Sequence, residues 1–148
     1  MSGALDIRPM QRADVEAVAE LCGQLGYPAT PEHLEERWTV IAGDRGHEVL
    51  VAVDAGRVVG WLHVSVRPVL ESDRTAEICG LIVDANVRGA GVGLALLTAA
   101  ERWAAAAGCD AIRVRSRIAR ERAHTFYERE GYVRVKTQHV FEKPLDSP

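Results

Sequence analysis

The fold is decided by residues 81–97, which read LIVDANVRGAGVGLALL. A hydrophobic strand ends at Val83, and a loop with Arg88 and three alternating glycines leads at once into a helix. Glycines adopt positive φ and let a ligand approach the backbone closely. A helix N-terminus offers unpaired N–H donors and a partial positive charge. The stretch therefore predicts an anion site, most often for a phosphate, to which Arg88 adds a charge-assisted contact.

Two other phosphate-binding motifs fit this turn poorly. A P-loop needs Gly-Lys-Ser/Thr, and the turn contains no lysine. A dinucleotide fingerprint belongs near the start of a chain of βαβ units, whereas this turn comes late and after a hairpin. A glycine-rich turn that binds nothing is the bland alternative.

The remaining sequence predicts one mixed α/β (α+β) sheet flanked by helices. Two valine-rich runs separated by Asp54-Ala55-Gly56-Arg57 indicate a hairpin. Thr30-Pro31 indicates a helix start, with a capping hydroxyl before a proline. The expected strands are residues 4–8, 48–53, 58–66, 74–83, 111–116, 132–136 and 139–142, and the expected helices are residues 14–25, 31–41, 94–107 and 121–130.

Composition predicts an ordinary globular protein. The 148 residues are 47% hydrophobic and 26% charged, with a formal net charge of −3, which fits a single domain over residues 1–148. No apolar run reaches membrane-spanning length and the N-terminal residues lack a signal-peptide core, so we expect a cytoplasmic protein. The three cysteines are widely separated and form no CxxC pair, which predicts no metal site.

Five arginines follow one another closely and raise the alternative of nucleic-acid binding. They are Arg113, Arg115, Arg117, Arg120 and Arg122. The first three alternate along a strand and share one face. Because the chain is acidic overall and no aromatic residues interleave with these arginines, a solvated or ion-paired face is favoured over a nucleic-acid partner.

Two motifs resemble the GNAT superfamily of N-acetyltransferases. Arg88-Gly89-Ala90-Gly91-Val92-Gly93 matches the Arg/Gln-x-x-Gly-x-Gly/Ala signature, and residues 123–132, AHTFYEREGY, resemble the A-x-x-x-Y-x-x-x-G-F segment. Residues 6–10, DIRPM, and Val59-Gly60-Trp61 also look like the family. The resemblance implies the GNAT fold, a single mixed and mostly antiparallel sheet with splayed central strands flanked by helices.

The same resemblance implies acetyl-CoA as co-substrate and no metal. The pyrophosphate would lie over the N–H groups of residues 89–94, and the pantetheine arm would pair with the strand that precedes the turn. Arg120 stands where many members have an asparagine that contacts the cofactor, so it either binds a CoA phosphate or that contact is absent. The expected cofactor-binding residues are Leu81, Ile82, Val83, Arg88, Gly89, Ala90, Gly91, Val92, Gly93, Leu94, Arg120 and Tyr127.

Acetyl transfer needs an amine without its extra proton and a proton for the departing thiolate. Tyr127 resembles the general acid of the family, although a tyrosine in this helical stripe could simply pack. Glu77 is the candidate base, on a strand face expected to carry Cys79, Leu81 and Val83 as well. A solvated or ion-paired Glu77 and a water relay are the alternatives. His124 is a further titrating group near Tyr127.

We therefore expect an acetyl-CoA-dependent N-acetyltransferase in which the amine of a small molecule or protein attacks the thioester directly. No nucleic-acid or membrane partner is expected, and the resemblance allows a homodimer. Two alternatives stay open, a non-catalytic acyl-CoA sensor and an arginine-rich module that binds nucleic acid or a protein partner.

Overall fold

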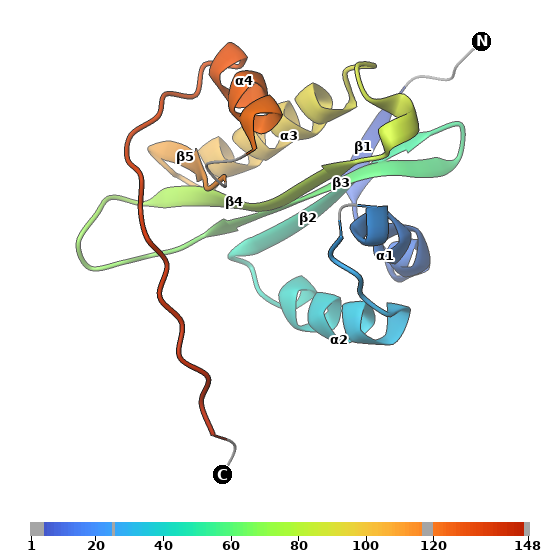
Figure 1. The fold of residues 1–148 in the computed structure, drawn as a ribbon, viewed down its shortest axis with the longest axis horizontal. Coiled ribbons are helices and arrows are strands. Elements are labelled where there is room, and N and C mark those ends of the chain that lie inside the picture. The colour runs from blue at the N-terminus through green and yellow to red at the C-terminus, as the bar shows by residue number, and fades with distance from the viewer. Residues whose placement is uncertain (1–4, 25, 117–119, 147–148) are drawn as a thin grey trace. The chain divides into compact units, whose positions relative to one another are not determined.

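The computed structural model describes residues 5–24, 26–116 and 120–146, and the chain forms two compact units, Met1–Arg115 and Ser116–Pro148. Ala4, Leu25 and Arg117, which entered the predictions above, lie outside the described residues. The first unit contains β1 (Asp6–Pro9), η1 (Arg12–Asp14), α1 (Val15–Gln24), α2 (Pro31–Ala42), β2 (His47–Asp54), β3 (Arg57–Val66), β4 (Thr75–Val83), η2 (Ala85–Val87), α3 (Val92–Ala106) and β5 (Ala111–Val114). The second unit contains α4 (Glu121–Arg129) (Figure 1).

The sheet has the order β1-β2-β3-β4-β5. The first three pairings are antiparallel and the β4–β5 pairing is parallel, which confirms the mixed, mostly antiparallel sheet. β4 and β5 pair only from Thr75 with Ala111 to Ile78 with Val114, although β4 runs on to Val83. This short pairing is the expected splay, and it leaves the second half of β4 without a β5 partner among the described residues.

Helices of the first unit cover opposite faces of the sheet (Figure 1). On one face, Val49, Val51, Trp61 and Ile82 belong to the cluster formed with α1 and α2. On the other face lies α3. A Cβ added to Gly60 of β3 would stand 3.2 Å from side-chain atoms of α3, so glycine lets that helix pack closely on the sheet.

A β-bulge at Cys79 interrupts β4. Gly80 pairs with His63 and Ile78 pairs with Val64, so Cys79 is the extra residue. An extra residue breaks the period-two alternation of side chains. Glu77 therefore lies on the face of Gly80 and Ile82 and opposite to Leu81, so the prediction that Glu77, Cys79, Leu81 and Val83 share one face is wrong.

Local signals place the helices well. The Thr30 hydroxyl accepts a 3.2 Å hydrogen bond from the His33 N–H, and Pro31 opens α2 as expected. α3 begins at Val92, two residues before the predicted start, because Gly91 at φ +82° is its N-cap. In β1 and η1, Arg8 and Asp14 form a paired salt bridge at 2.7 and 3.0 Å that fixes the start of the chain's first helical segment.

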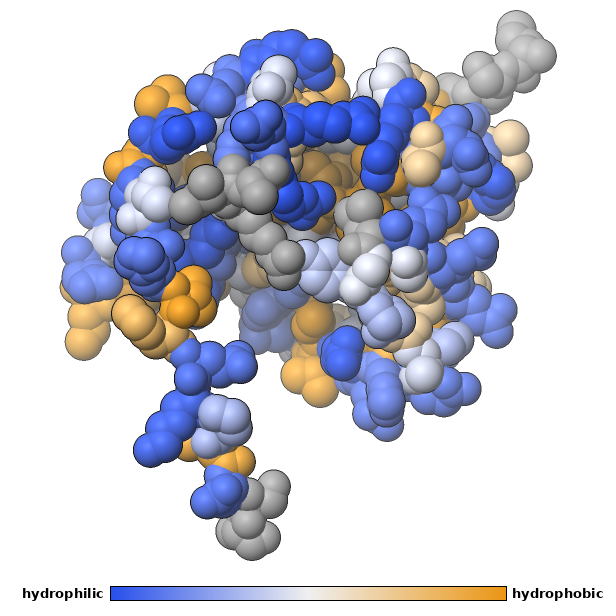
Figure 2. Space-filling view, in the orientation of Figure 1, coloured by the Kyte–Doolittle hydropathy of each residue, from blue (hydrophilic) through white to orange (hydrophobic). Residues whose placement is uncertain are grey.

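The two C-terminal strands predicted at 132–136 and 139–142 do not form in the described structure, because residues 132–146 have no strand or helix. Their sequence alternates as a strand does, but an alternating sequence needs a paired edge before it forms a ladder. Val133, Val135, Val140 and Phe141 are instead 70–92% exposed. Figure 2 shows apolar side chains beside hydrophilic ones along this end of the chain.

In the described part of the chain, each helix is too short or too polar to cross a membrane.

Candidate active site

The turn between β4 and α3 presents backbone N–H groups without a side-chain cap. Gly89 and Gly91 have φ of +87° and +82°, values that L side chains adopt with strain. Nothing lies within 4 Å of a Cβ added at either position, so the space above both is open. Gly91, the N-cap of α3, has no side chain with which to cap the helix, and the first backbone bond joins the Ala95 N–H to the Gly91 carbonyl at 3.0 Å. The first-turn donors can thus meet an anion.

Asp84 holds the start of this turn. Its side chain is 8% exposed and accepts hydrogen bonds from the Asn86 N–H at 3.0 Å and from Arg57 at 3.3 Å. The Asp84 N–H donates to the Val59 carbonyl at 2.8 Å. These contacts fix the path of η2 against β3, and so they set where the glycines and Arg88 begin.

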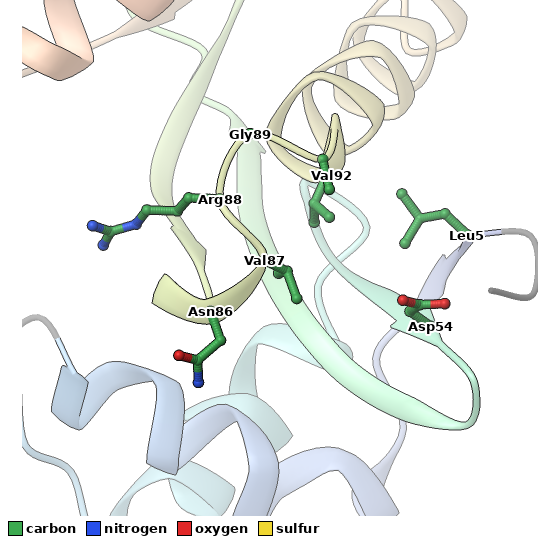
Figure 3. Close-up of a pocket in the computed structure, with 8 residues that line it drawn as sticks. Leu5, Asp54, Asn86, Val87, Arg88, Gly89 and Val92 are labelled. Atoms are coloured by element: carbon green, nitrogen blue, oxygen red, sulfur yellow. The ribbon is translucent and has the colours of Figure 1, made fainter. Parts of the chain in front are cut away.

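An open cavity of about 560 Å³ lies beside the turn. It is lined by Leu5, Asp54, Asn86, Val87, Arg88, Gly89, Ala90 and Val92 (Figure 3). Arg88 extends away from Leu5 and Asp54, which lie on the other side of the turn. The carboxylate of Asp54 would repel a phosphate on its side of the turn. The N-terminus of α3 is therefore a better phosphate site on the side toward which Arg88 extends.

Among the described residues, no strand pairs with one edge of the backbone that leads to the turn. Leu81, Ile82 and Val83 pair with β3 on one side. On the other side the β5 pairing has already ended at Ile78. An extended ligand can add itself to such an edge by main-chain hydrogen bonds. The expected pantetheine residues therefore lie where a strand-like arm could pair.

Glu77 is held by two arginines. Its carboxylate accepts from Arg115 Nε at 2.9 Å and from Arg67 at 3.2 Å, and its side chain is 15% exposed. Burial raises the pKa of Glu77, but the two guanidinium groups outweigh burial and bring the pKa below its ordinary value. Glu77 is therefore ionised at neutral pH and a weaker proton acceptor than an ordinary glutamate.

Tyr127, Arg120 and His124 belong to the second unit. Arg120 is the exposed N-cap of α4, and His124 is half-buried on that helix. The Tyr127 ring packs against Phe126 and Tyr132 at centroid distances of 5.2 and 5.7 Å. Burial raises the pKa of the Tyr127 phenol, which Arg120 lowers to a smaller extent. The phenol therefore keeps its proton at neutral pH, as a proton donor must.

The sequence did not predict a row of polar side chains on β2, β3 and β4. His47 of β2 and His63 of β3 stack with ring centroids 5.1 Å apart, and His47 Nδ1 lies 2.9 Å from His63 Nε2. The Ser65 hydroxyl lies 3.3 Å from Cys79 Sγ. The signal was one histidine just before the first strand of the predicted hairpin and one inside its second strand, but a bulge at Ala52/Val53 sets their register and no local pattern reveals it.

Comparison with known proteins identifies the family. The family model for "Acetyltransferase (GNAT) family" matches residues 13–132. Aminoglycoside N(6')-acetyltransferase type 1 from Stenotrophomonas maltophilia is 30% identical over 99% of this chain and 97% of its own.

Solved structures share the fold. AAC(6')-Iy in complex with the bisubstrate analog CoA-S-monomethyl-acetylneamine has a TM-score of 0.86 at 19% identity, covering 97% of this chain and all of that one. A transcriptional regulator from Bacillus halodurans C-125 also has a TM-score of 0.86, at 24% identity, covering 95% of this chain and all of that one.

These matches confirm the predicted fold and enzyme class and favour the N-acetyltransferase over the sensor and the arginine-rich module. The glycine turn, the splayed sheet and the sequence match over nearly the whole chain together show that the chain belongs to the acetyltransferase (GNAT) family.

Proposed function

We propose that this enzyme transfers the acetyl group of acetyl-CoA to a primary amine of a small cationic amino sugar, with an aminoglycoside as the first candidate. The observation that carries the proposal is that β4, which no described strand pairs on the β5 side beyond Ile78, runs directly to the α3 N-terminus, where the N-cap is a glycine. One 148-residue domain would perform the reaction, because the family match spans both compact units.

Coenzyme A would be held mainly by backbone. Its pyrophosphate would meet the N–H groups of residues 89–94, where the helix end favours negative charge. Arg88 is exposed and would pair with a phosphate oxygen. The pantetheine amides would pair with Leu81 and Val83 as an added strand. Arg120, in the second unit, is proposed for another CoA phosphate.

The reaction would proceed by direct attack. The amine nitrogen forms a bond to the thioester carbon, the tetrahedral centre collapses, and the carbon–sulfur bond breaks. Tyr127, as the general acid, would give its phenolic proton to the departing thiolate and take up the second proton of the acetylated nitrogen, so that the phenol ends the step neutral. Glu77 would attract the cationic acceptor and assist its loss of a proton.

The acceptor class is supported by charge and by relatives. Polycationic amino sugars suit a chain of net charge −3 whose α2 carries exposed acidic residues such as Glu32 and Glu36. The relative that is 30% identical is an aminoglycoside N(6')-acetyltransferase. A protein amine is the second candidate acceptor, and the sequence alone allows it.

The test is a panel of amines assayed for release of free CoA thiol from acetyl-CoA. Neamine, glucosamine 6-phosphate and a lysine peptide present a polycationic sugar, an anionic amino sugar and a protein amine. We expect kcat/KM to be highest for neamine. A preference for the peptide would show that the acceptor is a protein amine and not an amino sugar. Tight binding of acetyl-CoA without any transfer would contradict the proposed reaction and favour a sensor.

A further inference from the structure

The sheet face opposite α3 carries a row of polar side chains beside the β4 bulge. The register places His47 opposite Ser65, and Ser65 opposite Glu77. His63 lies opposite Gly80, next to the bulged Cys79. Cross-strand partners share a face, so His47, His63, Ser65 and Glu77 all project from the face on which Trp61 packs toward α1 and α2.

The two histidines and Asp44 form a chain that leads outward. His47 Nε2 lies 3.7 Å from Asp44 Oδ2, and the Asp44 side chain is 59% exposed. His47 Nδ1 lies 2.9 Å from His63 Nε2. A proton on His47 Nε2 faces Asp44, which makes His47 Nδ1 the acceptor and His63 Nε2 the donor. In this tautomer His63 Nδ1 carries a lone pair.

The proposed cofactor geometry brings the thioester to this place, and the inference below rests on that proposed function. In that geometry the pyrophosphate would lie at the N-terminus of α3, and the pantetheine arm would run back along β4 from Val83 to Leu81. The next positions toward the start of β4 are Gly80 and Cys79, where the thioester would lie. α3 covers the other face of β3 and β4, so we place the approach of the amine on the face that carries His63.

We propose that His63 is the catalytic group that receives the proton of the acceptor ammonium, and that His47 and Asp44 conduct it to solvent. The ammonium loses one proton to His63 Nδ1, and the freed lone pair forms the carbon–nitrogen bond. The Nε2 proton of His63 passes to His47 Nδ1, and His47 releases its Nε2 proton to water beside Asp44. When the tetrahedral centre collapses, the nitrogen loses its second proton, which replaces the one that Tyr127 gives to the thiolate. The ammonium and acetyl-CoA thus give the amide, the CoA thiol and the one proton that His47 releases, and no oxidation is involved.

The charges around His63 fit this role. His47 lies beside it from β2, and the register places Gly80 opposite it on β4, with Glu77 further along the same face and paired to Arg67 and Arg115. Burial, and then His47, lower the pKa of His63 below its ordinary value. The ring is therefore neutral and able to accept a proton at neutral pH. Because two arginines already pair with Glu77 and bring its pKa below the ordinary value, that carboxylate is the weaker candidate to take the proton.

The decisive experiment compares the pH profiles of kcat and kcat/KM for the parent, His63→Gln and His47→Gln. The control is His33→Gln, at an exposed position of α2. We expect His63→Gln to lose at least about tenfold in kcat at pH 7 and to recover as the amine deprotonates at high pH. His47→Gln should lose less and move the acidic limb, and His33→Gln should match the parent. A His63→Gln profile equal to that of the parent would overturn the proposal.

Two further measurements keep the proposal testable if the His63 variant is unstable. In His63→Ala, added imidazole should restore part of the lost rate, which a merely structural histidine would not allow. In the folded parent, the ring titration of His63 followed by NMR should coincide with the acidic limb of kcat/KM, and a clear mismatch would refute the role. Failure of the parent to acetylate any amine would instead count against the proposed function itself.

Discussion

The two ends of β4 differ in the groups that they offer to a ligand, backbone groups at one end and side chains at the other. At its C-terminal end, the open edge of Leu81 to Val83 and the N-terminus of α3 offer backbone groups. Toward its N-terminal end, Glu77 of β4 and His63 of β3, which lies opposite Gly80, offer side chains on one face of the sheet. Every acetyl-CoA is the same molecule, so a backbone site suits the cofactor, whereas acceptors differ and suit side chains. The cofactor can therefore be inferred from the sequence more easily than the acceptor can.

The largest effect should come from Gly91→Asp, which attacks the backbone end. The substitution forces an L side chain into φ +82° and places a negative charge where a phosphate should bind. A carboxylate placed against a phosphate in the site costs several kcal/mol of binding free energy. The affinity for CoA, measured by calorimetry, should therefore fall at least about 100-fold. Gly108→Asp, at φ +82° beyond the other end of α3, is the matched control and should bind CoA as the parent does. Equal affinity in the parent and in Gly91→Asp would remove the turn from the cofactor site.

Tyr127→Phe tests the leaving-group step, which neither end of β4 performs. The variant keeps the ring that packs on Phe126 and Tyr132 and removes only the hydroxyl. We expect kcat to fall by at least about tenfold, a floor under the usual contribution of a general acid. The melting temperature and the acetyl-CoA affinity should barely change. Full activity would show that water protonates the thiolate.

Glu77→Gln tests the side-chain end, with a smaller expected loss. The pKa of Glu77 lies below its ordinary value because Arg115 and Arg67 outweigh burial, so the parent carboxylate is ionised throughout the neutral range. The rate should fall several-fold near pH 7 and recover partly at high pH, where free amine is abundant. Glu16→Gln on the exposed side of α1 serves as control. An unchanged pH–rate profile would leave Glu77 with a purely structural ion pair.

The smallest effect on catalysis is expected from Asp14→Asn, away from both ends of β4. The Asp14 side chain is 7% exposed and accepts from Arg8 and from the Gln11 N–H. The hydrogen bond from Arg8 lowers the pKa of Asp14, although burial opposes it. The stabilisation is therefore present above the ordinary value of 3.8 and is lost as the pH falls through the lowered pKa. Urea unfolding at pH 7 should show a loss of about 1–3 kcal/mol, and the gap to the parent should close in acid while kcat stays unchanged.

Sequence predicted what depends on neighbouring residues. Thr30-Pro31, the hairpin turn and the glycines of the β4–α3 turn act within a few residues, so their elements were placed to within about two residues. The face of Glu77 was mispredicted because one extra residue at Cys79 shifts the alternation, and nothing local announces a bulge. The histidine pair depends on register between β2 and β3. The strands at 132–136 and 139–142 were mispredicted because alternation specifies a face but not a partner.

The bulge at Cys79 has a consequence for how this enzyme can vary. β4 has one residue more than β3 opposite it, and its pairing with β5 ends one residue earlier, at Ile78. Bulges bend a strand and increase its twist, so the slot between β4 and β5 depends on how many residues β4 contains rather than on which residue stands at position 79. Many side chains could replace Cys79 without closing the slot, whereas deleting that one residue would straighten the strand and let β4 pair further along β5. We therefore expect substitutions at position 79 to be tolerated and a deletion there not to be.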